Sequence, residues 1–434
     1  MKARAGCRAI VAATIAGVLA APAIGAETLQ DAWVRALAND RGLAAVRSQA
    51  EAAGFDAAAA RAARWPTLAV GGSYNWLDDA PAFDFSFTGL PVVPPEVFDG
   101  DDFAMGAATL TVPLFTGGRI SSGIAAAEAR SRGAGAAAVG AEQDLRLAVA
   151  DAYVNVLRAR KALAVADSNV RTLEALVGDI DAMYERELVP KNDLLAVQVA
   201  LADARQNRLR AANAAEIAQA GYNRRLGEPL DRVVELTDGI PEPEPLPTDL
   251  APLVSRAVEH RTELAALGEQ AKAYGQLAKV ERSRVLPQVS LSGGYNYVEN
   301  QFLDDDAFTM AGVGVHWALF DGGQARKRAA ALDRNRRATE EQRADVESLI
   351  ALQVRQAWLD VGETRQRVGV TADAVDQAEE NLRIARERYG AGLGTQTQLL
   401  EAETLRVQAL GNRDNATLDA ALARLRLARA VGSL

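Results

Sequence analysis

The chain contains the same structural phrase twice. "VPLFTGGRI" ends at Ile120, and "WALFDGGQA" stands 205 positions later. From there on, an offset of 205 maps the first half on the second without a gap, as in Gly227 and Gly432, whereas upstream the offset is 221. The extra length of the first copy lies in "PAFDFSFTGLPVVPPEVFDG", between two strand candidates. Insertions are tolerated where the backbone is exposed, so the sequence predicts two copies of one unit, with a longer end loop in the first.

Residues 1–26 have the pattern of an export signal. Basic residues precede the apolar run "AIVAATIAGVLAA", and "APAIGA" offers small residues for cleavage near Ala26. Cleavage removes three positive charges from a net charge of −9, giving −9 − 3 = −12, a sign that disfavours a nucleic-acid partner. The single cysteine, Cys7, precedes the apolar run, so we expect neither a disulfide nor a lipid-bearing cysteine in the mature chain.

The mature chain is expected to divide into two repeats, at 27–240 and 253–434. Between them, residues 241–252 carry prolines on alternate positions. Because proline cannot continue a helix, this segment is predicted to be extended. It is either a strap between equal halves or an ordinary linker.

Two strand hairpins are predicted, at 67–115 and 288–319. Apolar residues alternate with small or polar ones over about 10 positions, with aromatics toward the ends, as in transmembrane β-barrels. A soluble antiparallel sheet with one wet face shows the same alternation. Four strands cannot close a barrel, since known barrels start at about 8, so several chains must combine their strands if these cross a membrane. The predicted lipid-facing residues are Leu68, Val70, Tyr74, Trp76, Leu110, Val112, Leu114, Val289, Leu291, Tyr295, Tyr297, Val315, Trp317 and Leu319.

Each strand hairpin is followed by a proline-free tract that predicts a very long helix. The first tract runs from Gly118 to about Val189, roughly 70 residues, which at 1.5 Å per residue would extend about 100 Å. Apolar residues recur at spacings of three and four, diluted by small residues, as in a coiled-coil seam that permits close helix approach. Proline or glycines then stop the helix, and a second helix returns. We expect helical hairpins over 118–227 and 323–432.

In order and spacing, these motifs resemble the TolC-like outer-membrane efflux protein family over essentially the whole mature chain. The resemblance rests on the duplication, the strand entries "RWPTLAV" and "VLPQVSL", the exits "LFTGG" and "LFDGG", and the tips "ELVPKNDLLAVQ" and "GLGTQTQLLEAE". It implies a membrane α+β fold: a homotrimer whose twelve strands, four per chain, close one outer-membrane β-barrel continued by a periplasmic α-helical coiled-coil barrel. It also implies a periplasmic adaptor (membrane fusion protein) and an inner-membrane pump or ABC exporter as partners. The strand–helix junctions would be Pro66, Gly117, Gly118, Pro287, Gly322 and Gly323.

The resemblance also implies a gate at the helical tips. Asp193 and Glu401 are the candidate constriction acids, and Gln398 stands where a second-half carboxylate is common. Tyr184 and Tyr389 are candidates for the closing hydrogen-bond network. From the residues alone, Asp193 is equally a helix N-terminal acid, and both tyrosines are equally seam residues. The tip residues implied in adaptor docking are Leu188, Val189, Pro190, Leu393, Gly394 and Thr395.

The sequence carries no set of residues that indicates an enzyme, a metal site or a cofactor. Its two histidines, His260 and His316, lie in different elements, and no phosphate loop, HExxH motif or nucleophile elbow is present. We therefore expect a passive duct for drugs, small molecules or secreted polypeptide, surrounded by outer-membrane lipid. The alternative is a soluble periplasmic coiled-coil adaptor or scaffold.

Overall fold

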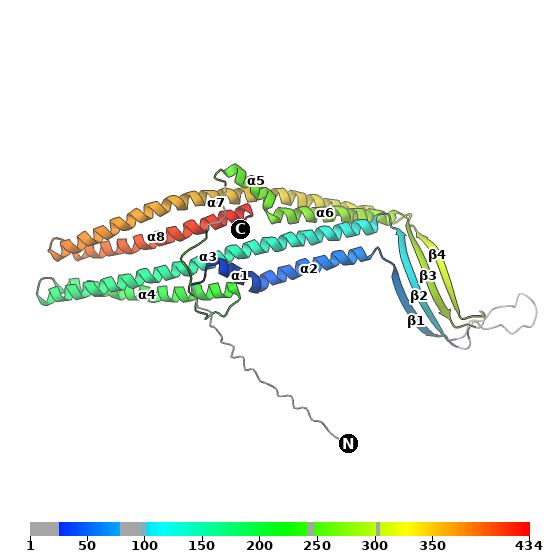
Figure 1. Cartoon of the computed structure of the whole chain (residues 1–434), viewed down its shortest axis with the longest axis horizontal. Helices are drawn as coiled ribbons and strands as arrows, with labels where there is room; N and C mark the ends of the chain where they lie inside the picture. The colour runs from blue at the N-terminus through cyan, green and yellow to red at the C-terminus, as the bar shows by residue number, and fades with distance from the viewer. Residues whose placement is uncertain (1–25, 79–97, 99–100, 242–246, 301–303) are drawn as a thin grey trace, which may run out of the picture.

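The computed structural model describes residues 26–78, 98, 101–241, 247–300 and 304–434. The expected signal peptide, most of the inserted loop and the middle of the proline-rich linker lie outside these residues. The described part of the chain forms a long rod of helices with a sheet at one end (Figure 1). None of the helices in this part combines the length and the apolar character that crossing a membrane requires.

The two halves contain the same elements in the same order. The first half consists of α1 (Leu29–Asn39), α2 (Arg41–Ala62), β1 (Thr67–Trp76), β2 (Asp102–Phe115), α3 (Arg119–Glu185) and α4 (Lys191–Leu226). The second consists of α5 (Leu250–His260), α6 (Thr262–Arg282), the short 3₁₀ helix η2 (Ser283–Val285), β3 (Gln288–Val298), β4 (Ala307–His316), α7 (Gln324–Gly390) and α8 (Gln396–Val431).

Element lengths confirm the duplication. α3 and α7 each have 67 residues, and α4 and α8 each have 36. The starts of both helix pairs are related by the smaller of the two sequence offsets, whereas the larger offset relates α1 to α5 and β1 to β3. The offset therefore changes between the first and second strands of each half, where the sequence placed the insertion.

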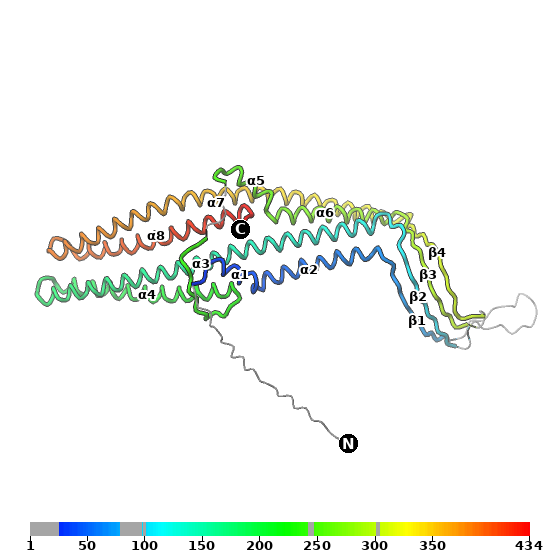
Figure 2. The backbone as a smooth tube through the Cα atoms, viewed as in Figure 1, coloured from blue at the N-terminus to red at the C-terminus, as the bar shows by residue number. Residues whose placement is uncertain are grey.

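Each 67-residue helix is covered by two shorter helices placed end to end. α2 packs on the sheet-proximal part of α3, and α4 packs on the distal part; α6 and α8 do the same on α7 (Figure 2). α3 also contacts α6 and α8, which joins the halves. The close approach depends on small residues: a Cβ at Gly140 of α3 would lie 2.6 Å from Thr262 Oγ1 at the start of α6.

The sheet is antiparallel, with strand order β1-β2-β3-β4, so β1 and β4 are its edges. The register puts Leu68 opposite Leu110, and Val112 opposite Leu291, which itself faces Val313. Directly opposed residues share a face, so the predicted lipid-facing residues within the strands lie on one side. Threonine, serine, glycine and asparagine occupy much of the other side. That the apolar side meets lipid stays a prediction.

Three of the predicted lipid-facing residues lie outside the regular strand pairing. β2 has a bulge between Pro113 and Phe115, so Leu114 has no ladder partner and Phe115 stands opposite Val289 instead. β4 ends at His316, which pairs with Gln288, the first residue of β3. Pro287 precedes Gln288 and has no N–H group, so the pairing of β3 with β4 stops at Gln288. Trp317 and Leu319 therefore follow the strand.

Pairs of left-handed glycines turn the chain from sheet to helix. Gly117 and Gly118 have φ of 57° and 85°, and Gly322 and Gly323 have φ of 65° and 80°. Residues with a Cβ rarely adopt this conformation. In the second half, the Asp321 carboxylate accepts the N–H of Ala325 at 2.7 Å and that of Gly323 at 2.8 Å. These N–H groups hold the pKa of Asp321 below its usual value.

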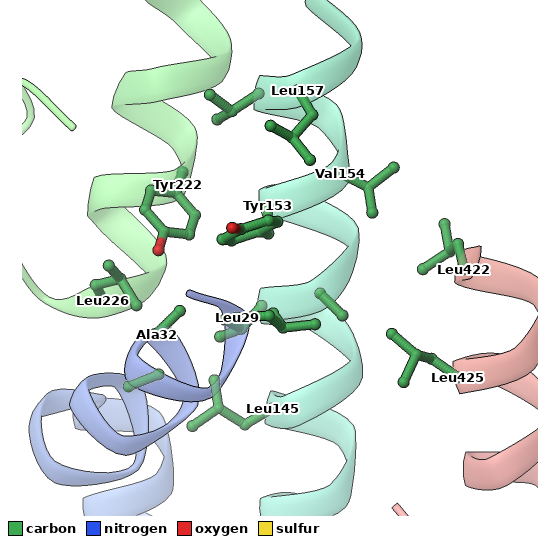
Figure 3. Packing of buried hydrophobic residues seen from close by; sticks show 14 of the residues in the cluster. Leu29, Ala32, Leu145, Tyr153, Val154, Leu157, Tyr222, Leu226, Leu422 and Leu425 are labelled. Atoms are coloured by element: carbon green, nitrogen blue, oxygen red, sulfur yellow. The ribbon is translucent and has the colours of Figure 1, made fainter. Parts of the chain in front are cut away.

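The largest buried cluster surrounds two tyrosines in the middle of the rod, where α1, α3 and α4 meet; we call this region the waist (Figure 3). Tyr153 of α3 and Tyr222 of α4 are fully buried, with ring centroids 6.0 Å apart and nearly perpendicular rings. The Tyr222 hydroxyl donates to Glu27 Oε1 at 2.8 Å, and Arg232 Nη2 donates to Oε2 at 2.7 Å. A carboxylate only 6% exposed is tolerated because both of its oxygens have donors. Burial, then Glu27, raises the pKa of Tyr222, so the hydroxyl stays a neutral donor.

Two residues that the duplication makes equivalent hold the two ends of the connector between the halves. The Tyr153 hydroxyl donates to the Thr237 carbonyl at 2.7 Å. Its second-half counterpart, Trp358, donates through Nε1 to the Thr248 carbonyl at 2.9 Å. These bonds attach the backbone at Thr237 and at Thr248 to the two long helices. That the connector acts as a strap stays a prediction.

We predict that Tyr222→Phe weakens the waist. The change leaves the buried Glu27 carboxylate with one donor fewer, which should cost about 1.5–3 kcal/mol because the lost hydrogen bond is to a charged group. Guanidinium unfolding followed by the helical circular dichroism signal measures this. Tyr274→Phe is the control, because that hydroxyl makes no hydrogen bond in the described part of the chain and its loss should change little. Equal midpoints for both variants would contradict the prediction.

We also predict opposite effects of alanine at two glycines of similar surroundings. No atom lies within 4 Å of a Cβ built at Gly322 or at Gly362, but only Gly322 has a positive φ. Gly322→Ala should destabilise the fold by about 1–2 kcal/mol through left-handed strain. Gly362→Ala, in the middle of α7, should stabilise it by about 0.5–1 kcal/mol. The same unfolding assay distinguishes them, and a neutral Gly322→Ala would mean that the junction relaxes.

Candidate functional site at the helical tips

The two helical hairpins turn through the same backbone geometry at the end of the rod farthest from the sheet (Figure 1). In the first tip, Leu188 N donates to Met183 O at 2.9 Å, and in the second Leu393 N donates to Arg388 O at 2.8 Å. Each turn contains one left-handed residue, which is Gly392 in the second tip and its counterpart Glu187 in the first. A glutamate in this conformation is strained, because its Cβ crowds the backbone.

The helices that leave the turns begin differently. Pro190 precedes α4 and offers no side-chain cap. Thr395 precedes α8 and forms a capping box: its Oγ1 accepts from Gln398 N at 3.4 Å, and Gln398 Oε1 accepts from Thr395 N at 3.3 Å. Gln398, a gate candidate in the sequence, is thus tied to its own helix start.

The outermost tip residues are apolar and exposed. Leu188 is 67% exposed and Leu393 is 72% exposed. Of the other residues implied in docking, Pro190 and Thr395 are exposed, while Val189 and Gly394 are half-buried. Gly394 lies close to its own helix end: a Cβ there would come within 3.3 Å of Tyr389 N.

Two of the gate candidates meet across the halves of the chain. The Tyr389 hydroxyl, from α7, donates to Asp193 Oδ2, from α4, at 3.3 Å. Burial and then the Asp193 charge raise the pKa of Tyr389 to about 12. A raised tyrosine pKa means that the neutral hydroxyl is retained below pH 10 and lost only as the pH approaches 12. The tyrosine therefore remains a hydrogen-bond donor at physiological pH.

The other gate candidates lie apart from this contact. Tyr184, the counterpart of Tyr389, makes no side-chain hydrogen bond within the described residues and is partly exposed. Glu401 is exposed and lines an open hollow of about 520 Å³ between α4 and α8, together with Ala196 and Thr404. A second hollow of about 300 Å³ separates the ends of α3 and α7, and Tyr389 forms part of its wall.

One ionic clamp was not anticipated from the sequence. Asp419 of α8 accepts from Arg158 of α3 at 2.6 Å and from Arg367 of α7 at 2.7 Å. The three residues connect both long helices through one carboxylate. No local signal could have identified it, because the partners are 261 and 52 residues from Asp419.

The described residues contain no site of the metal-binding type. Nowhere in the described ranges do three His, Cys, Asp or Glu side chains gather as they would around an ion. His260 ends α5 and His316 ends β4, in separate parts of the rod.

Comparisons with known proteins agree with this architecture. A family model described as outer membrane efflux protein matches residues 33–228 and 253–433. The outer membrane efflux protein BepC of Brucella suis is 30% identical over 157 residues, which are 36% of this chain and 34% of BepC. The match thus spans about a third of that relative's length.

Solved structures show the same fold along nearly the whole chain. The outer membrane protein VceC of Vibrio cholerae has a TM-score of 0.80 at 19% identity, covering 93% of this chain and 96% of VceC. The CmeC outer membrane channel of Campylobacter jejuni has a TM-score of 0.79 at 14% identity, covering 93% of this chain and 85% of CmeC. Because the family model covers both structural halves, the chain belongs to the outer membrane efflux protein family, and it resides in the outer membrane with its helices in the periplasm.

Proposed function

We propose that this chain is one subunit of a homotrimeric exit duct in a tripartite export system. The observation that carries the proposal is a four-stranded sheet with two open edges, joined directly to helices about 100 Å long. Backbone groups at an open edge have no hydrogen-bond partner in lipid. Three chains would bring 3 × 4 = 12 strands, enough to close a barrel by pairing β1 of one chain with β4 of the next.

The helical rods would continue that barrel as a tunnel across the periplasm. Each chain supplies two similar helical pairs, so three chains would place six similar units around one axis. The duct itself is passive, and an inner-membrane pump or ABC exporter would supply the energy. Drugs, small molecules or secreted polypeptide are the cargo classes that such a duct conducts.

The tips are the proposed docking surface for a periplasmic adaptor. Their leucines, Leu188 and Leu393, are apolar side chains that are 67% and 72% exposed, on turns of matched geometry. Six such turns in a trimer offer a repeated surface to an adaptor. A soluble adaptor or scaffold could also carry a sheet with one apolar side, so the two functions are separated by the solubility and conductance of the mature protein.

In the gate that we propose, the two repeats contribute different side chains to the constriction. A trimer would present three Asp193 carboxylates and, at the equivalent positions of the second repeats, three Gln398 amides. Glu401 would add three further carboxylates if it faces the pore. The contact between Tyr389 and Asp193 supports a role in holding the two hairpins of one chain together at the tip.

The function is tested by the mass of the mature protein in detergent together with conductance in a planar bilayer. We expect a mass near three times that of the mature chain and discrete conductance steps, because strand edges pair only in a closed assembly. A water-soluble monomer without conductance would overturn the duct and favour the adaptor.

The tip contact is tested by two matched substitutions. We predict that Tyr389→Phe raises the open probability of a mostly closed channel by about tenfold or more, because it removes the hydroxyl that binds Asp193. Losing one hydrogen bond to a charged group corresponds to about 1.5–3 kcal/mol. Tyr184→Phe is the control, since Tyr184 makes no such bond within the described part of its chain. Equal open probabilities in the two variants would remove Tyr389 from the gate.

A further inference from the structure

Basic residues gather where the sheet meets the helices. We define the junction collar as residues 61–66, 116–121, 281–287 and 319–328, which flank the ends of the strands that face the helices. It contains eight basic and two acidic residues, a net charge of 8 − 2 = +6 in a mature chain of net charge −12. All eight basic side chains are exposed, and both acids are half-buried. The basic residues are Arg61, Arg64, Arg119, Arg282, Arg284, Arg326, Lys327 and Arg328.

The two acids of the collar are already engaged within the chain. Asp321 caps α7 by accepting two backbone N–H groups, and Glu281 pairs with Arg284 at 3.0 Å. Arg61 and Arg282 pair with acids of the neighbouring long helices. The remaining cations include four with neither an ion pair nor a side-chain hydrogen bond in the described part of the chain, namely Arg64, Arg326, Lys327 and Arg328.

Three of these cations lie at the N-terminal end of α7, where positive charge is unfavourable. Arg326, Lys327 and Arg328 follow directly on the start of α7 at Gln324, and the first turn contains no acid. The N-terminus of a helix carries a partial positive charge, so cations there reduce helix stability. The Asp321 carboxylate offsets part of this charge, but three cations exceed one acid. Positions that oppose a local preference are expected at functional sites. The three residues are successive, so they spread around the face of α7 left free by the buried Ala325 and Ala329.

Tryptophans mark the depth at which these cations lie. Trp65, just before β1, is 72% exposed, and Trp317, just after β4, is 54% exposed. Exposed tryptophan is typical of the boundary between hydrocarbon and lipid headgroups. From Gln324 to Arg328 the helix rises about 6 Å, and the headgroup layer is about 5–8 Å thick on each side of a bilayer. With the tryptophans at that boundary, Arg326, Lys327 and Arg328 would lie level with the lipid phosphate groups.

We propose that the junction collar binds the headgroups of anionic phospholipids in the periplasmic leaflet of the outer membrane. Each lipid phosphate would accept hydrogen bonds from Arg326, Lys327, Arg328 or Arg64 and neutralise charge at the start of α7. The collar would thereby set the depth of the sheet and retain acidic lipid around the trimer. The inference rests on the outer-membrane location and is independent of what the channel conducts.

The test is retention of lipid by the purified trimer. Wild-type protein is placed in nanodiscs of four parts phosphatidylcholine to one part phosphatidylglycerol and re-extracted in mild detergent, and bound lipid is counted by mass spectrometry. We expect phosphatidylglycerol to be enriched about threefold or more over the offered ratio. The enrichment should disappear in 1 M salt, where charges more than about 3 Å apart are screened.

The deciding variant is Arg326→Gln, Lys327→Gln and Arg328→Gln together. It should lose the enrichment while remaining trimeric by size-exclusion chromatography. The matched control is Arg355→Gln, Arg365→Gln and Arg386→Gln, three exposed arginines of the same helix without ion pairs in the described residues; it should keep the enrichment.

Three results would overturn the proposal. They are wild-type retention in the offered ratio, an equal loss in both variants, and enrichment that survives in the collar variant. In the first case an anionic partner of another class, such as cell-wall peptide, would become the better candidate. Conductance of both variants reports separately on the duct, so failure of the collar and failure of the proposed function are distinguishable.

Discussion

The hydrogen-bonding demand of the backbone governs this molecule. A four-stranded antiparallel sheet leaves one side of β1 and one side of β4 without partners, and lipid offers none. The sheet is therefore incomplete as a membrane element until other chains supply strands. The helices face no such demand, since each satisfies its own backbone. For this reason the sheet requires the proposed trimer. The symmetry of the closed barrel then sets the arrangement of the helices in the tunnel.

Duplication lets the chain use several structural features twice. Paired left-handed glycines turn the chain at both junctions, and Tyr153 and Trp358 hold opposite ends of the connector. The copies differ where one copy performs a task alone. At the tips, Asp193 contacts Tyr389, whereas its counterpart Gln398 is used to cap a helix. Such differences turn a near-sixfold arrangement into a threefold one.

Charged residues differ between the rod and the junction collar. Along the rod, arginines and acids pair between helices, as in the clamp on Asp419 that joins α3, α7 and α8. At the junction collar, cations exceed acids and several remain unpaired within the described part of the chain. An acidic chain with a net-basic collar beside its sheet would separate two tasks, cohesion along the rod and placement in the bilayer.

The sequence by itself determined the elements and their order. Period-two alternation, proline-free tracts and constant offsets are local signals, and they placed both strand pairs, the long helices and the glycine junctions. Only the tertiary structure decided where β4 ends, that Leu114 falls in a bulge, that Tyr389 binds Asp193, and that Glu27 is buried beneath Tyr222. Each of these depends on a partner far away in the chain. Periodicity reports which face of an element is apolar, but it carries no information on which distant side chain completes a hydrogen bond.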